Sequence, residues 1–155
     1  MLPREMPELT RGLKQQGFHI TIETAGTIDK PVVCDLMSIS PKLSNSDPSL
    51  ERAGEDWLKR HQATRQQPEI VQALIDRYPY QLKFVVDSVE DVDEIGAYLE
   101  MITDWDPARV MLMPEGIRQD ELERKEVWLK PICDQRGFQL CRRMHILWYG
   151  NRRGT

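Results

Sequence analysis

Apolar and polar positions follow two periodicities in turn along this chain, one typical of strands and one typical of helices. Short apolar or alternating stretches rich in β-branched and aromatic residues predict five strands. They are residues 18–23, 31–38, 81–87, 109–113 and 138–148. Stretches with helical spacing predict helices at residues 6–16, 50–65, 68–77, 89–103 and 118–136. Strands that alternate with helices are typical of an α/β fold, with a parallel sheet covered by helices on at least one face.

Local signals support several of these elements. Gly17 and Gly137 stand where helices should stop, and Ser88 with Asp91 three residues later resembles a capping box. The second strand is apolar almost throughout, as a strand buried on both faces should be. Asp35 within it would be costly unless paired, so we expect it to bond a lysine or a backbone amide.

Ligands of parallel α/β sheets bind at the carboxyl ends of the strands. The segments that follow four of the predicted strands are polar or rich in glycine and proline. They are residues 23–26, 38–42, 87–88 and 113–116. The sequence therefore predicts a ligand site on this rim.

Composition excludes several classes of function. The net charge of −4 argues against general binding of nucleic acids, and the cluster Arg142, Arg143, Arg152 and Arg153 is better explained as a solvated strand end than as a nucleic-acid patch. The apolar stretches are too short to cross a bilayer, and the amino terminus lacks the pattern of a signal peptide. We therefore expect a cytoplasmic protein without a membrane segment.

The cysteines and histidines have no catalytic or metal-site spacing. Cys34, Cys133 and Cys141 are too scattered for a metal site, and we expect reduced thiols, with Cys34 and Cys141 in the core. His19 and His145 fall on predicted strands, where each could be buried and hydrogen-bonded or could bind a ligand.

Four segments together resemble one enzyme family. They are Phe18-His-Ile-Thr-Ile-Glu-Thr-Ala-Gly-Thr27, Asp35-Leu-Met-Ser-Ile-Ser-Pro-Lys42, Leu112-Met-Pro-Glu-Gly116 and Met144-His-Ile-Leu-Trp-Tyr-Gly-Asn-Arg-Arg-Gly154. In this order and spacing, over nearly the whole chain, they resemble the 7-carboxy-7-deazaguanine synthases. These are radical S-adenosylmethionine enzymes of queuosine and deazapurine biosynthesis.

The resemblance implies a fold and a set of ligands. The expected fold is a single domain over residues 1–155 whose parallel βα repeats form part of an incomplete TIM-like barrel. Full-length relatives bind S-adenosylmethionine, a [4Fe–4S] cluster and magnesium, and convert the pterin 6-carboxytetrahydropterin into 7-carboxy-7-deazaguanine.

The resemblance also implies roles for particular residues. By position, Glu23 and Thr24 match a segment that contacts S-adenosylmethionine, and Ser40 with Lys42 matches a segment near its ribose and carboxylate. The remaining residues match segments that line the adenosine or substrate pocket: Met113, Pro114, Glu115 and His145.

The chain departs from the family in two motifs. The cluster motif Cys-x-x-x-Cys-x-x-Cys and the segment Gly-Gly-Glu-Pro, which grips the methionine amino group, are both absent. We therefore expect a truncated synthase, the C-terminal portion of a larger enzyme, that is inactive alone because the cofactor supplies the difficult step.

Two alternatives stay open beside this enzyme fragment. One is a binding module that retains a nucleoside or pterin pocket without turnover, and the other is a self-associating structural protein. The predicted first strand has no strand before it, so its edge at residues 19–23 is expected to pair with a second copy in a homo-oligomer.

Overall fold

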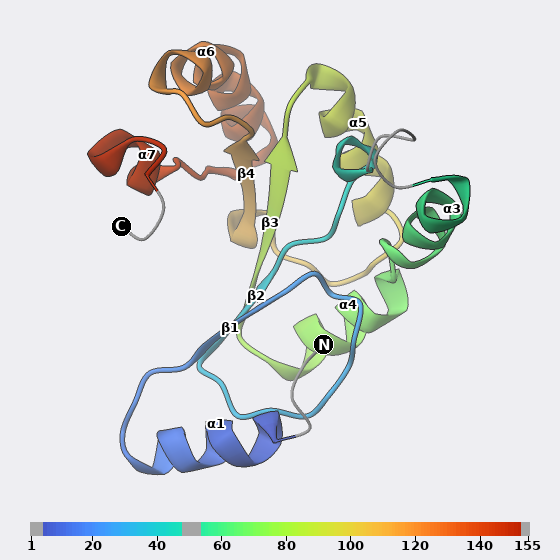
Figure 1. The fold of residues 1–155 in the computed structure, drawn as a ribbon, viewed down its shortest axis with the longest axis vertical. Coiled ribbons are helices and arrows are strands. Elements are labelled where there is room, and N and C mark those ends of the chain that lie inside the picture. Colours follow the sequence, from blue (N-terminus) through green and yellow to red (C-terminus); the bar gives the residue numbers. More distant parts are fainter. Residues whose placement is uncertain (1–4, 48–53, 153–155) are drawn as a thin grey trace.

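The computed structural model describes residues 5–47 and 54–152. Its centre is one sheet of five parallel strands in the order β1-β2-β3-β4-β5 (Figure 1). The strands are β1 Thr21–Thr24, β2 Leu36–Ile39, β3 Tyr80–Val86, β4 Val110–Pro114 and β5 Gln139–Leu140. The sheet is not closed, since β1 and β5 are its two edges. The predicted α/β fold of parallel βα repeats, open as in a partial barrel, is confirmed.

Helices precede and connect most of the strands. They are α1 Met6–Gln15, α3 Glu55–Thr64, α4 Pro68–Arg77, α5 Val89–Leu99, α6 Gln119–Arg136 and α7 Met144–Tyr149, with 3-10 turns η1 Ser44–Ser46 and η2 Pro107–Arg109. In the parts of the chain that the structure describes, no helix has the length and apolar character needed to cross a membrane.

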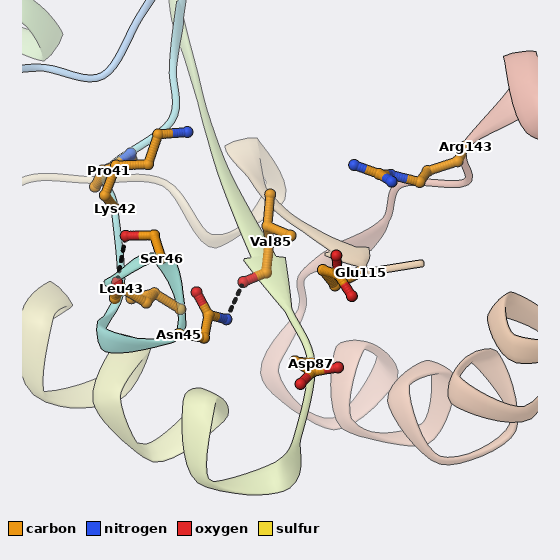
Figure 2. Close-up of a pocket in the computed structure, with 9 residues that line it drawn as sticks. All are labelled: Pro41, Lys42, Leu43, Asn45, Ser46, Val85, Asp87, Glu115 and Arg143. Atoms are coloured by element: carbon orange, nitrogen blue, oxygen red, sulfur yellow. Dashed lines mark hydrogen bonds between the residues drawn. The ribbon is translucent and has the colours of Figure 1, made fainter. Parts of the chain in front are cut away.

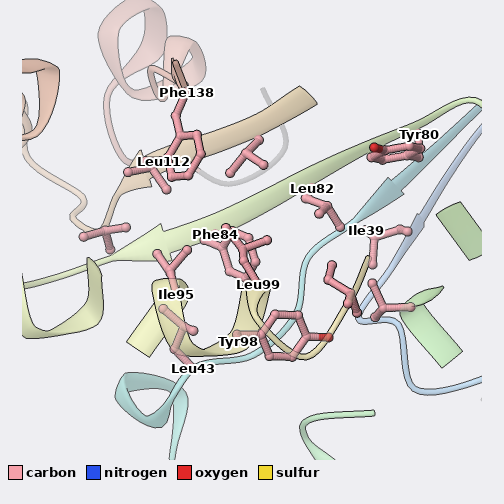
Figure 3. Close-up of a cluster of buried hydrophobic side chains, with 14 of the residues drawn as sticks. Ile39, Leu43, Tyr80, Leu82, Phe84, Ile95, Tyr98, Leu99, Leu112 and Phe138 are labelled. Carbon is pink, nitrogen blue, oxygen red and sulfur yellow. The ribbon is translucent and has the colours of Figure 1, made fainter. Parts of the chain in front are cut away.

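The apolar core lies on one face of the sheet. Alternate residues of β3 are buried, and Phe84 packs edge-to-face on Tyr98 of α5 with ring centroids 5.8 Å apart (Figure 3). Helices α4, α5 and α6 supply the other side of this core through side chains such as Leu74, Ile95 and Leu129. This face therefore accounts for most of the apolar burial that stabilises the fold.

The opposite face, which we call the open face, has a different character. The strand register places Ser38 beside Gln81 and Lys83 beside Met111, and the Gln81 amide donates to Ser38 Oγ at 2.9 Å. Apart from Ser38, these side chains are only partly buried, and none belongs to the core cluster. The partly buried polar side chains of this face, Gln81 and Lys83, are therefore within reach of a ligand, whereas Ser38 is buried.

Several local predictions are confirmed. Helix α5 begins directly after Ser88, whose N–H donates to Asp91 Oδ2 at 2.9 Å in a capping box. Asp35 accepts hydrogen bonds from Lys14 Nζ and, at 2.8 Å, from the Ile20 N–H. The carboxylate thus finds both of the partner types that the sequence led us to expect.

The second predicted strand is shorter than expected. Residues 31–35 are irregular, because their amides are satisfied outside a strand ladder: the Val32 N–H donates to Tyr78 Oη and the Val33 N–H to Thr10 Oγ1, each at 3.1 Å. The predicted bounds 31–38 are therefore wrong at their start, whereas burial on both faces is confirmed for β2 itself, since Met37, Ser38 and Ile39 are all buried. Residues 25–35, between β1 and β2, also contain no helix, so strands and helices do not alternate throughout.

The fifth predicted strand, residues 138–148, is wrong beyond its first few residues. β5 pairs with β4 through Gln139 and Leu140, and β4 ends at Pro114. Beyond residue 142 an extended chain would have no neighbouring strand for its amides, so it forms helix α7, in which Ile146 N–H donates to the Arg143 carbonyl at 3.0 Å. His145 consequently lies on an exposed helix and not on a strand.

Burial differs from expectation at one histidine and among the cysteines. His19 is exposed and lies before β1, so it is neither buried nor on a strand. In the helix predicted over residues 50–65, whose first residues 50–53 lie outside the described residues, Trp57 is 54% exposed and its ring stacks on His61. Cys133 is the buried thiol, whereas Cys34 and Cys141 are only half-buried.

Candidate ligand-binding rim

A cavity of about 410 Å³ lies at the carboxyl ends of the strands. Figure 2 shows the residues that line it, which come from the segments after β2 and β4, the end of β3 and the segment after β5. They are Pro41, Lys42, Leu43, Asn45, Ser46, Val85, Asp87, Glu115 and Arg143. The site is thus on the rim that the strand order predicts, and its volume suits a small molecule.

Helix α5 fixes the loop that forms one wall of this cavity. The Ser44 N–H donates to Glu94 at 3.0 Å, and Asn45 Nδ2 donates to Asp91 Oδ2 at 2.9 Å and to the Val85 carbonyl at 3.0 Å. Leu43 is buried in the core cluster. Because buried and hydrogen-bonded neighbours hold it on both sides, the segment from Pro41 to Ser46 is a preorganised wall.

Lys42 is a cation with no partner among the described residues. It is half-buried and forms no ion pair or hydrogen bond there, although it lines two cavities. The second cavity, of about 480 Å³, lies between this loop and helix α3 and includes Thr27 and Arg65. An unpaired, partly desolvated ammonium group is suited to an anionic ligand group.

Arg143 forms the facing wall (Figure 2). Its Nη1 donates to the Gly116 carbonyl at 2.6 Å, and no carboxylate in the described ranges lies within ion-pairing distance. Its Nε is buried and has no hydrogen-bond partner among the residues that the structure describes. The guanidinium is therefore held at one nitrogen and unsatisfied at another.

The two carboxylates of the cavity are already compensated. Lys125 of α6 contacts Asp87 Oδ1, lies 3.8 Å from Glu115 Oε2, and donates to the Glu115 carbonyl at 2.7 Å. With Lys42 and Arg143, three cations surround two carboxylates, so the cavity favours an anion.

The open face continues toward the rim through an ion pair across the sheet. Lys83 Nζ on β3 lies 3.6 Å from Glu23 Oε1 on β1. The lysine side chain is 20% exposed and the glutamate 76% exposed, so the carboxylate retains free oxygen surface for a ligand.

The four residues expected to contact S-adenosylmethionine do not all lie at the cavity. Lys42 lines the cavity, and Ser40 follows β2 directly, its N–H donating to the Thr24 carbonyl at 2.7 Å. Glu23 is on the open face, whereas Thr24 is on the helix side, where its hydroxyl accepts from the Gly26 N–H at 3.1 Å. Lys42 therefore lies at the cavity, and Thr24 does not.

The four residues expected at the substrate are also divided. Glu115 lines the cavity, Met113 is half-buried on the open face beside Val85, and Pro114 is buried as the last residue of β4. His145 is exposed on α7 and does not line this cavity.

Sequence reasoning missed Arg143 and Lys83 as site residues. Arg143 was grouped with other basic residues as a solvated strand end, and no local pattern separates it from Arg142. Lys83 is a charge inside an otherwise apolar strand, which is a signal that could have drawn attention to the open face.

The three cysteines are not arranged as metal ligands. Burial raises the pKa of the Cys34, Cys133 and Cys141 thiols, which disfavours the thiolate form. Across the described ranges, no group of three or more His, Cys, Asp or Glu side chains could hold a metal ion.

Fold and rim together define a class of protein: a parallel βα protein with an open sheet and a small-molecule cavity at the carboxyl ends of its strands. No protein-family model matches the chain. The chain is 39% identical over its whole length to the 7-carboxy-7-deazaguanine synthase of Rhodopirellula baltica, of which it covers 60%. It is 37% identical over 85% of its length to the synthase of the same name from Halobacterium salinarum, of which it covers 55%.

A solved structure agrees with the fold. QueE from Escherichia coli matches 87% of this chain with a TM-score of 0.56 and 23% identity, and the chain covers 48% of that protein. The resemblance found in the sequence is therefore confirmed: the chain is similar over 85–100% of its length to two proteins named 7-carboxy-7-deazaguanine synthase. It spans about half to three fifths of the length of these relatives.

Proposed function

We propose that this chain carries the S-adenosylmethionine and substrate part of a 7-carboxy-7-deazaguanine synthase site and takes part in queuosine or deazapurine biosynthesis. The observation that supports this most is Lys42, an unpaired cation on a preorganised loop that lines the rim cavity. Lys42 is the last residue of one of the four segments that carry the family resemblance. The single sheet and its one core cluster support treating residues 1–155 as one domain.

In this proposal, Lys42 holds the carboxylate of S-adenosylmethionine and Ser40 contacts its ribose. Glu23 contacts the same ligand from the open face, where Lys83 orients the carboxylate. The backbone of Thr24 forms part of the same strand end, with its hydroxyl retained in the turn at Gly26. S-adenosylmethionine is the source of the hydrogen-abstracting group in this family.

The substrate occupies the side of the cavity formed by β4 and the segment that follows it. Met113 and Glu115 flank this side, and Pro114 fixes the strand end by its burial. A pterin such as 6-carboxytetrahydropterin has a flat pyrimidinone ring and carries one carboxylate on its reduced ring, and this single negative charge suits a cavity with more cations than carboxylates. His145 has the family resemblance as its only support, because it is exposed.

The described residues do not fit an iron–sulfur cluster. The thiols have raised pKa values from burial, and the acidic and histidine side chains form no group of three. The roles of this chain's residues are therefore to bind, orient and shield ligands. We propose that the chain alone does not cleave S-adenosylmethionine. A nucleoside- or pterin-binding module without turnover is the second candidate, and the same thiol environments favour it.

Binding of S-adenosylmethionine to the chain tests the first part of the proposal. In an NMR titration, we expect shifts of the amides of residues 40–46 and a dissociation constant that Lys42→Met weakens about tenfold. Lys130→Met is the matched control, since Lys130 pairs with Asp134 on the outer side of α6 and should leave binding unchanged. Equal losses in both variants, or no binding by the wild-type chain, would refute the site.

Turnover separates the synthase from the binding module. After anaerobic treatment with iron, sulfide and a reductant, we expect no 5′-deoxyadenosine from the chain alone. A chimera with the part of the Rhodopirellula baltica synthase that the chain does not match should form 7-carboxy-7-deazaguanine. A folded, cluster-containing chimera that binds S-adenosylmethionine but forms no product would favour the module without turnover.

A further inference from the structure

Two adjacent arginines after β5 face opposite sides of the molecule. Arg142 Nε lies 2.9 Å from Glu126 Oε2 of α6, on the outer side of the sheet edge. Arg143 instead lines the rim cavity, and Figure 2 shows its guanidinium directed toward the loop that carries Lys42. Neighbouring residues of equal charge thus have different surroundings, which makes them a natural comparison.

Contacts within the described ranges do not account for the position of Arg143. Only Nη1 has a hydrogen-bond partner there, the Gly116 carbonyl at 2.6 Å, and Nε is buried with none. Buried donors without partners are uncommon in folded proteins. A guanidinium anchored at one nitrogen still has free N–H donors in a planar fork, which is the geometry that binds a carboxylate.

Arg143 and Lys42 come from opposite walls of the cavity. Lys42 follows β2 and Arg143 follows β5, and three strand spacings separate these ends by about 14 Å. The apolar side chains Pro41, Leu43 and Val85 line the cavity as well. The arrangement suits two anionic groups, one at each wall, and a flat apolar ring between them.

We propose that Arg143 binds the carboxylate of a planar, carboxylated deazapurine or pterin on the wall of the cavity opposite Lys42. The inference rests on the proposed function, because the ligand class comes from the name shared by the two synthases. It adds a specificity residue: Arg143 selects the carboxylated ring over a neutral ring of the same shape.

The test compares a charged ligand with its neutral isostere on the whole chain. We would titrate 7-carboxy-7-deazaguanine and its 7-carboxamide analogue into the chain and measure both dissociation constants by NMR. The wild-type chain should prefer the carboxylate by about tenfold or more. Arg143→Gln should abolish this preference by weakening carboxylate binding, and it should change carboxamide binding less than about twofold.

Two further variants separate a direct contact from a general effect of charge. Arg142→Gln removes the same charge one residue away and should leave both constants unchanged. Arg143→Lys keeps the charge without the planar fork, so it should retain part of the preference. Equal loss for both ligands in Arg143→Gln, a similar loss in Arg142→Gln, or no preference in the wild-type chain would overturn the proposal.

Titration with S-adenosylmethionine distinguishes failure of this inference from failure of the proposed function. If the wild-type chain binds S-adenosylmethionine but shows no preference for the carboxylate, the role of Arg143 alone is wrong. If it binds neither S-adenosylmethionine nor the deazapurines, both proposals fall. Arg143→Gln should bind S-adenosylmethionine like the wild-type chain, which also shows that the variant is folded.

Discussion

Lys83 Nζ lies 3.6 Å from Glu23 Oε1, so an ion pair on the open face joins β3 to β1 across the intervening strand β2. The glutamate is mostly exposed, and such pairs contribute little to stability, typically less than about 1 kcal/mol. The ion pair is therefore important mainly because it fixes the position of the Glu23 carboxylate.

Glu23→Gln and Lys83→Met should affect ligand binding more than stability. We expect each to change the free energy of unfolding by less than about 1 kcal/mol, measured by urea denaturation. Each should weaken S-adenosylmethionine binding severalfold, and the double variant should lose less than the two single losses combined. Additive losses would show that Lys83 does not act through Glu23.

Two core tyrosines differ in whether their hydroxyl groups are satisfied. Tyr80 Oη accepts from the Asp106 N–H at 2.9 Å, whereas Tyr98 Oη is buried and has no hydrogen-bond partner within residues 5–47 and 54–152. Tyr80→Phe should destabilise the fold by about 1 kcal/mol, and Tyr98→Phe should be neutral or stabilising by up to about 1 kcal/mol. Thermal and urea unfolding of the two variants would measure this difference, and a larger loss in Tyr98→Phe would contradict it.

Substitution by alanine should lower the stability of the fold at Gly26 and raise it at Gly12. Gly26 has φ +72°, and a Cβ there would lie 2.6 Å from Val71 Cγ2, so Gly26→Ala should cost about 2 kcal/mol or more. Gly12 lies within α1, where a Cβ would meet nothing within 4 Å, and Gly12→Ala should stabilise by about 0.5–1 kcal/mol. Urea denaturation of both variants checks the opposite signs.

Asp35 should make the fold sensitive to acid. Hydrogen bonds from Lys14 and the Ile20 N–H lower the pKa of Asp35 from its ordinary value of 3.8. A lowered folded-state pKa gives a stabilisation that is present above the ordinary value and is lost as the pH falls through the lowered one. Asp35→Asn should therefore reduce the unfolding free energy at pH 7 and have a smaller effect near pH 3.

The control for this prediction is Asp93→Asn, since Asp93 is exposed on α5. It should change stability little at either pH. An effect of Asp35→Asn that was equal at pH 7 and pH 3 would show that the carboxylate charge is not the cause.

The free edge of β1 should promote self-association of the chain. The Ile20 carbonyl accepts from the Leu36 N–H and the Thr24 carbonyl from the Ser40 N–H, so the backbone of Thr21 points away from β2. Thr21→Pro should remove an outward N–H without breaking the β1–β2 ladder and should lower the dimer fraction, measured by light scattering at several concentrations. Thr21→Ser should leave it unchanged, and a monomeric wild-type chain at high concentration would contradict this interface.

Sequence patterns predicted the elements whose ends are set by local chemistry. The bounds of α4 agree at both ends because Pro68 suits a first helical turn, and α5 begins where Ser88 and Asp91 can cap it. Asp35 could be predicted to need a partner because an isolated carboxylate in an apolar stretch is costly.

Features that depend on distant segments could not be predicted in this way. β5 pairs with β4 through Gln139 and Leu140, and β4 ends two residues beyond this pairing, at Pro114, so residues beyond 142 have no neighbouring strand and residues 144–149 form α7. The different surroundings of Arg142 and Arg143 depend on the same junction, which is the segment between β5 and α7. The rim was predictable from strand order, whereas Arg143 as a cavity residue was not.

The brevity of β5 makes this junction a point where insertions and deletions would alter ligand choice. Two residues, Gln139 and Leu140, join the strand to the sheet, and Arg143 follows three positions later. Successive side chains of an extended segment point to opposite sides, so one residue gained or lost here would exchange the inward arginine for the outward one. Homologues that differ in length at this junction should therefore differ in their preference for charged ligands while retaining the same fold.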